Sequence, residues 1–148
     1  MFSKYIIVLF MSMSILFSKD RSPAQFWSSY NESEKLAFIN GAFGAISKLK
    51  AHHKSEVRKQ YMHNDNWVEP YYIERYYDIM NEYLAEEVGY NIQIISMHLD
   101  AFYTNSDNTN IPILEALRIV SLHQDGEKKT ANSRLLRSQR RYSSGYNQ

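Results

Sequence analysis

The stretch Pro70–Leu84, PYYIERYYDIMNEYL, decides the fold class of this chain, because its apolar residues recur with helical spacing. They form two stripes that lie about 100° apart and together span about 160° of the helix surface. The first stripe contains Tyr72, Tyr76, Ile79 and Tyr83, and the second contains Ile73, Tyr77, Met80 and Leu84. We predict a helix that begins between Trp67 and Pro70 and ends at Gly89. A stripe this wide is typical of a helix that packs against two neighbours.

The same aromatic stripe has a second interpretation, in which part of it stays exposed. Tyrosine combines an apolar ring with a polar tip, and this suits surfaces that are wet and that bind a partner. Tyr72 and Tyr76 are therefore candidate binding residues in addition to candidate core residues.

Helical signals continue toward the N-terminus. Asn31 and Glu34 have the spacing of a capping box, which predicts the start of a helix that runs to about Tyr61. Its apolar residues Leu36, Ile39, Phe43 and Ile46 lie within an arc of about 80°. Gly41 and Gly44 weaken a helix, so we expect the backbone of a neighbour to approach them closely. A short amphipathic element with Phe26 and Trp27 starts at Pro23.

Two further helices are predicted toward the C-terminus. The segment 91–103 has apolar residues on two nearly opposite faces, so we expect a central helix with His98 partly buried between them. A helix opened by Pro112 and ended by Gly126 has a buried stripe of Ile113, Ala116, Leu117 and Val120. The chain is therefore predicted to be all-α, a compact four- to five-helix bundle.

The two ends of the chain differ from this middle part. Residues 1–18 combine an early lysine with a short apolar run, the pattern of a secretory signal peptide. An uncleaved membrane anchor and an ordinary buried helix are the alternatives. We predict a signal peptide at 1–18, a helical domain at 19–126 and a basic, disordered tail at 127–148. Export places the protein in the periplasm or outside the cell.

Charge and composition exclude several classes of function. The net charge is +1, so the chain as a whole lacks the basic excess of a nucleic-acid-binding protein. It has no cysteine, which excludes disulfides and thiolate metal sites. Acids cluster between Glu69 and Glu87, and six bases without an acid lie between Lys128 and Arg141. The basic tail is either simply solvated or a weak contact for an anionic surface.

Candidate site residues gather at the end of the 91–103 helix. His98 and Asp100 are two residues apart and diverge on a helix, whereas Asp100 and Tyr103 can meet and share a hydrogen bond. With Asn110 they predict a polar corner. It forms either a small recognition pocket, a network that fixes the loop, or a catalytic site that uses a perturbed Asp or His. No hydrolase, P-loop or dinucleotide motif is present, and we expect neither a metal ion nor a cofactor.

Two segments resemble a group of small exported bacterial helical proteins of unknown function. The first is Lys35–Gly41, which fits K-x-x-[FY]-[IV]-x-G after a tryptophan, here Trp27. The second is Leu99–Tyr103, followed by Asn110–Ile113 and Ala116–Leu117. The resemblance implies export and a compact helical domain, and it implies no activity or ligand.

We therefore predict an exported, non-enzymatic helical domain that binds a protein or an envelope partner. A specialised version is an inhibitor or immunity-type protein that neutralises a toxin. The rival hypothesis is a small hydrolase or metal-dependent enzyme that uses His98, Asp100, Tyr103 and Asn110. A third hypothesis is a structural protein that an uncleaved N-terminus holds on the inner membrane.

Overall fold

A computed structural model describes residues 21–64, 66–85 and 91–143, and all their regular structure is helical. This confirms the predicted all-α class. The helices are α2 (Pro23–Ser28), α3 (Glu32–Tyr61), α4 (Tyr71–Asn81), α5 (Ile92–Phe102), the 3-10 turn η2 (Ser106–Asn108), α6 (Ile113–Gln124) and α7 (Lys128–Ser143). The predicted signal peptide at 1–18 lies outside the described residues.

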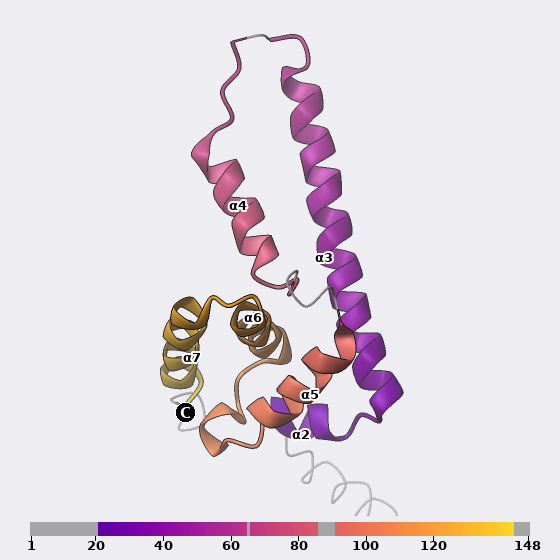
Figure 1. The fold of residues 1–148 in the computed structure, drawn as a ribbon, viewed down its shortest axis with the longest axis vertical. Coiled ribbons are helices and arrows are strands. Elements are labelled where there is room, and N and C mark those ends of the chain that lie inside the picture. Colours follow the sequence, from indigo (N-terminus) through magenta and orange to yellow (C-terminus); the bar gives the residue numbers. More distant parts are fainter. Residues whose placement is uncertain (1–20, 65, 86–90, 144–148) are drawn as a thin grey trace, which may run out of the picture.

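Helix α3 is the longest helix, with 30 residues, and it begins where the capping box predicts. Asn31 accepts a hydrogen bond from the backbone of Glu34, and the Glu34 side chain accepts one from the backbone of Asn31. Thirty residues make a rod of about 45 Å. Only Ile39 and Phe43, both in its first half, are fully buried. The second half of α3 extends beyond the other helices, and α4 runs back beside it (Figure 1).

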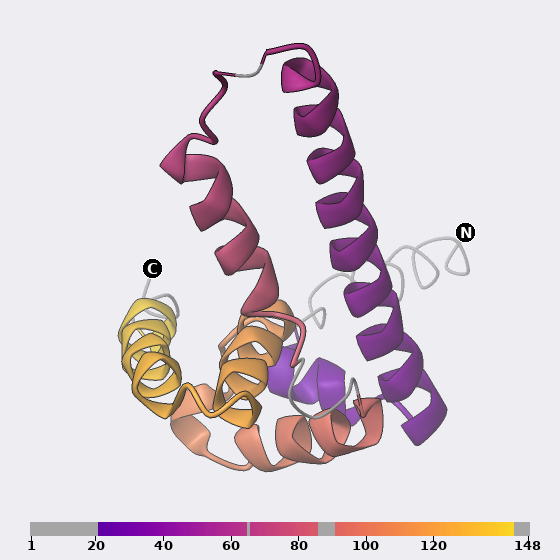
Figure 2. The ribbon, with the colours of Figure 1, turned by 45° about the horizontal axis from the view of Figure 1, so that its top comes forward.

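The molecule thus has two parts, which both views show (Figures 1 and 2). We call α2, residues 32–46 of α3, α5, α6 and α7 the base. We call the protruding hairpin, residues 48–64 and 66–81, the arm. The base holds almost all of the fully buried apolar side chains, whereas the arm contributes only Ile73 and Tyr77 to the buried set.

Helix α6 is the centre of the base. Six of its twelve residues are buried, and it contacts α2, α5 and α7. The prediction that the 91–103 helix is central is wrong, because α5 buries only one of its two apolar faces. Ile95 and Leu99 are buried, while Met97 and His98 are exposed. The predicted start and end of α6 are confirmed. Pro112 precedes its first residue, and Gly126, which has a φ of 76°, follows its last turn.

Helix α4 ends earlier than predicted, at Asn81, and Gly89 lies outside the described residues. The chain then turns away from the helix, and Ala85 adopts a φ of 40°, which is strained for a residue with a side chain. Within the described residues, α4 packs against α3 along Ile73 and Tyr77. The expectation of two packed stripes is wrong at Tyr72 and Tyr76, which are exposed.

The expectation of a close backbone neighbour at Gly41 and Gly44 is also wrong. A methyl group added at either position would meet no atom within 4 Å outside the glycine's own stretch of helix. Both glycines face open space on α3. Nothing in the described structure therefore requires glycine at these positions.

Residues 128–143, predicted to be part of a disordered tail, form helix α7 instead. Ala131 and Ser138 are buried, and Leu135 and Tyr142 pack against the core of the base. These four residues follow one another at intervals of four, three and four, which is the spacing of a helix face. The prediction of disorder failed because two of the four are small, and bases surround them. Residues 144–148 lie outside the described part.

None of the helices in the described residues is long and apolar enough to span a bilayer.

Candidate functional site

The first candidate site is the end of α5, where Asp100 joins three elements. Asp100 Oδ1 accepts hydrogen bonds from Trp27 Nε1 at 2.8 Å and from Lys35 Nζ at 2.7 Å. Lys35 Nζ also lies 5.6 Å from the centre of the Trp27 ring. The Lys35 side chain is 14% exposed and that of Asp100 is 44% exposed. Asp100 therefore connects α2 and α3 to α5. Both hydrogen bonds are accepted by the same carboxylate oxygen, Oδ1.

Tyr103 does not bond to Asp100 as predicted. Its hydroxyl donates to the backbone oxygen of Ile111 at 2.8 Å, and burial raises the pKa of this hydroxyl well above its usual range. Nearby, the Asn108 side chain donates to the backbone oxygen of Phe102 at 2.8 Å and accepts from Gln139 at 2.9 Å. Asn110 is half-buried in the same loop. These bonds hold the loop between α5 and α6 in place.

The enzyme hypothesis needs His98, Asp100 and Tyr103 in one pocket. His98 is exposed on α5, and two residues of helix separate it from Asp100 by about 200° around the axis. A shallow cavity beside Trp27 is lined by Asp100 and Tyr103 but not by His98. Within the residues that the structure describes, no group of three or more His, Asp or Glu side chains could hold a metal ion. The geometry here is that of a joint between helices.

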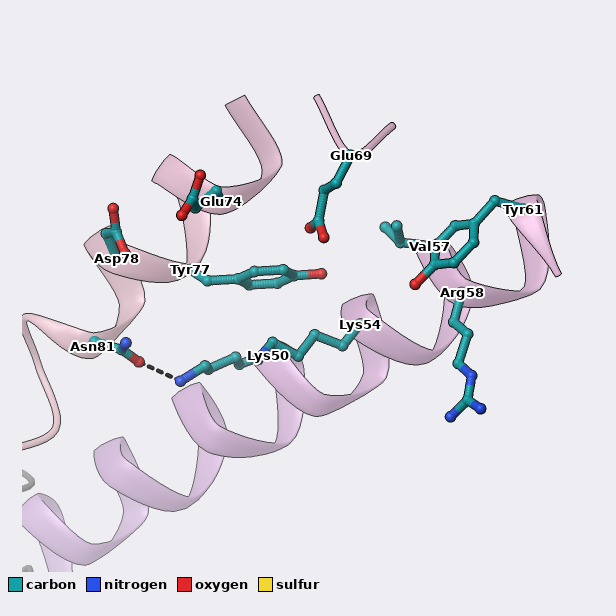
Figure 3. A pocket seen from close by; sticks show the side chains of 10 residues that line it. All are labelled: Lys50, Lys54, Val57, Arg58, Tyr61, Glu69, Glu74, Tyr77, Asp78 and Asn81. Carbon is teal, nitrogen blue, oxygen red and sulfur yellow. Dashed lines mark hydrogen bonds between the residues drawn. The ribbon is translucent and has the colours of Figure 1, made fainter. Parts of the chain in front are cut away.

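The second candidate site is the groove between the two helices of the arm (Figure 3). It has a volume of about 700 Å³, and its walls carry opposite charges. Lys50, Lys54 and Arg58 come from α3, whereas Glu69, Glu74 and Asp78 come from α4 and the residues before it. Val57, Tyr61, Tyr77 and Asn81 complete the lining.

Few of these charges neutralise one another. Lys50 donates to the Asn81 side chain, and Lys54 Nζ lies 4.9 Å from the centre of the Tyr77 ring (Figure 3). Among the described residues, no ion pair joins Glu69 or Glu74 to a base. A groove with one basic and one acidic wall therefore stays open to water. Such a groove can accept a segment that presents charges of both signs.

Aromatic side chains surround this groove. Tyr61 and Trp67 stack with ring centres 3.9 Å apart and close the outer end of the arm. His53 Nδ1 lies 2.9 Å from the Tyr77 hydroxyl, so this pair fixes α4 against α3. Loss of contact with water, and to a smaller extent the Glu69 carboxylate, raises the pKa of Tyr77.

Exposed tyrosines lie on the flank of α4 opposite the charged groove, where Tyr72 lines a second cavity between α3 and α4 and the Tyr76 ring lies 5.0 Å from that of His53 on α3. Tyr72 is 71% exposed and Tyr76 is 42% exposed, and Tyr71 and Val68 are exposed beside them. The sequence predicted Tyr72 and Tyr76 as candidates, and the structure places both on the same exposed helix face. It places them far along the arm from Asp100, so the candidates from sequence do not form one site.

The charged walls of the groove were missed at the sequence level. The acids of residues 69–87 and the bases near His52 were each visible as a cluster. Their juxtaposition depends on α4 folding back along the second half of α3. The sequence signal that could have predicted the groove is the short turn between the basic end of one helix and an acidic helix, since a hairpin places the two side by side.

Comparison of the chain with protein-family models, curated proteins and solved structures finds no match. The resemblance to small exported helical proteins thus stays a prediction. Three of the residues on which it rests, Trp27, Lys35 and Asp100, meet in one hydrogen-bonded group in the base.

Proposed function

We propose that this chain is an exported, non-enzymatic helical domain that binds a protein partner through its arm. The observation that carries the proposal is the exposure of Tyr72 and Tyr76 on one flank of α4, with a groove between a basic and an acidic wall on the other flank. Tyrosines of this kind serve as anchors at protein interfaces, because they bury a large area at a low cost in side-chain entropy.

Folding of the base does not account for these residues. Tyr72 is 71% exposed, and Tyr76 keeps 42% of its surface in water although its ring lies near His53, so covering these rings would contribute about 1 to 2 kcal/mol each. Exposed aromatic residues gathered on one helix face, with charged residues nearby, are typical of an interaction surface. The arm also projects from the base, so a partner can contact α4 without disturbing the core (Figure 2).

The charges of the groove indicate which side chains a bound segment of the partner would carry. A segment that occupies it would direct basic side chains toward Glu69 and Glu74 and acidic ones toward Lys54. The rival enzyme hypothesis has weaker support, since Asp100 and Tyr103 are engaged in holding helices and His98 lies elsewhere.

Site-specific photo-cross-linking tests the proposal. A benzophenone amino acid replaces Tyr72 in one variant and Leu136, an exposed apolar residue of α7, in a control, and both are irradiated in the organism that makes the chain. We expect a discrete protein adduct from Tyr72 only. The absence of an adduct at Tyr72, or the same adducts at both positions, contradicts binding through the arm.

A folding control accompanies this experiment. Because Tyr72 is 71% exposed and Tyr76 is 42% exposed, with its ring near His53, Tyr72→Ala with Tyr76→Ala should lower the free energy of unfolding by less than about 2 kcal/mol. Adducts formed by a probe at Val68 should disappear in this double variant. Export is tested separately: the intact mass of the protein from the exported fraction distinguishes removal of residues 1–18 from their retention.

A further inference from the structure

Three guanidinium groups converge on one buried carboxylate where the end of α4 meets α6 and α7. Glu82 Oε2 accepts a hydrogen bond from Arg118 Nε at 2.7 Å, and it forms ion pairs with Arg118 Nη2, at 2.5 Å, and with Arg134 Nη2. Arg75 Nη2 lies 3.8 Å from Glu82 Oε1. The side chains of Glu82, Arg118 and Arg134 are 9%, 13% and 18% exposed, so water reaches this cluster poorly.

The charges of this cluster do not balance. Glu82 neutralises one of the two poorly exposed guanidinium groups, Arg118 and Arg134, whereas Arg75 is half-exposed and also lies 3.9 Å from Asp78. Excess charge with little access to water is costly. Arg134 Nε is buried and has no hydrogen-bond acceptor within the described residues. An additional anion would both reduce the excess charge and supply further acceptors.

A cavity of about 480 Å³ opens directly onto the cluster. Four bases and two acids line it, and the second acid is Glu127. Lys129, Ser133 and Arg137 follow one another at intervals of four residues and line the cavity from α7. Among the described residues, neither Lys129 nor Arg137 forms an ion pair. The cavity therefore presents two cations without an ion-pair partner in the described part of the chain, Lys129 and Arg137, together with the Ser133 hydroxyl group and the polar Glu82 cluster.

We propose that this cavity is a binding site for a phosphate-type oxyanion. Arg137 and Arg134 would donate to its oxygens, Lys129 would supply a compact charge, and Ser133 would donate through its hydroxyl. Glu82 holds Arg118 and Arg134 in place and remains outside the ligand shell. The site is separate from the arm groove, so it stands independently of the protein partner proposed above.

The phosphate group can belong to a free ion or to the headgroup of a lipid, and two probes distinguish these sources. Inorganic phosphate is titrated into the full chain by calorimetry at constant ionic strength, with chloride as the reference. Vesicles of phosphatidylcholine, with and without one quarter phosphatidylglycerol, are tested by sedimentation. Saturable binding in the first assay indicates a soluble ligand, and binding to the anionic vesicles alone indicates a lipid headgroup.

The variants decide whether the cavity is responsible. Lys129→Gln with Arg137→Gln removes two cavity cations without altering the Glu82 cluster. Lys128→Gln with Arg141→Gln removes the same charge from α7 outside the cavity lining. We expect affinity to fall about tenfold or more in the first variant and less than about twofold in the second. Absence of binding to either probe, or equal losses in both variants, overturns the proposal.

Discussion

The base and the arm are built from the same long helix and yet bury their side chains very differently. The first half of α3 places Ile39 and Phe43 in the core of the base, beside the hydrogen-bonded group of Trp27, Lys35 and Asp100. The second half faces one helix, α4, across a charged groove, and it contributes no fully buried residue. Sequence segments with comparable helical patterns thus differ in what they contact.

The difference indicates that the base provides stability and that the arm is available for binding. Apolar burial and satisfied polar groups stabilise the base, so changes there should act on folding. The arm keeps tyrosines and charges exposed, so changes there should act on binding with little effect on folding.

Trp27→Ala should have the largest effect on stability. It removes a fully buried aromatic side chain from the centre of the base, and such changes cost about 3 to 5 kcal/mol. Urea unfolding monitored by circular dichroism gives the value. Phe26→Ala, a neighbouring change of an exposed ring, is the matched control and should cost less than about 1.5 kcal/mol. Equal costs would contradict the placement of Trp27 at the centre of the base.

Asp100→Ala should destabilise the chain by about 1 to 3 kcal/mol. It leaves Trp27 Nε1 and Lys35 Nζ without their shared acceptor, although the partial exposure of Asp100 limits the loss. Asp100→Asn keeps an acceptor oxygen for Trp27 but loses the charge that attracts Lys35, so its cost should be smaller. An alanine variant as stable as the parent would refute the role of Asp100 as a joint.

Tyr103→Phe should cost about 0.5 to 1.5 kcal/mol at neutral pH, because the hydrogen bond to Ile111 is lost. Burial raises the pKa of Tyr103, so the folded chain keeps a proton that the unfolded chain loses at a pH of about 10. The stability that Tyr103 contributes is present below this pH and declines above it. The difference between parent and variant should therefore narrow as the pH rises above about 10.

A gap between parent and Tyr103→Phe that stays constant up to pH 11, measured by urea unfolding at each pH, would contradict the burial of this hydroxyl.

Gly41→Ala and Gly44→Ala should each stabilise the chain by about 0.5 to 1 kcal/mol. Both glycines lie inside α3 with open space where a methyl group would go, and alanine favours a helix more strongly. Thermal unfolding of the two variants measures the gain. A loss of stability at either position would reveal a neighbour that the described residues do not include.

Local signals predicted most helix limits in the sequence. Asn31 and Glu34 marked the start of α3, and Pro112 and Gly126 marked the limits of α6. These features depend on residues a few positions apart, so their physics is contained in a short segment. Helix α7 escaped prediction because Ala131 and Ser138 are too small to give an apolar signal, although they pack closely against α6.

The candidate sites were less predictable, since their geometry depends on distant residues. Trp27 and Asp100 lie 73 positions apart, and no local spacing relates them. Tyr103 was expected to contact Asp100, but the loop between α5 and α6 offers it the backbone oxygen of Ile111. The aromatic stripe allowed two interpretations, in which Tyr72 is either part of the core or exposed. Among the described residues no second helix packs on that side of α4, and Tyr72 is therefore exposed.

Native-state hydrogen exchange of the free chain tests the division between base and arm most directly. We expect amides of α4 to exchange at least about tenfold faster than those of α5 and α6, because few buried contacts hold the arm. Addition of a partner should slow exchange in α4 and leave α6 unchanged. If amides of α4 in the free chain exchange as slowly as those of α6, the arm belongs to the folding core, and the division between base and arm is wrong.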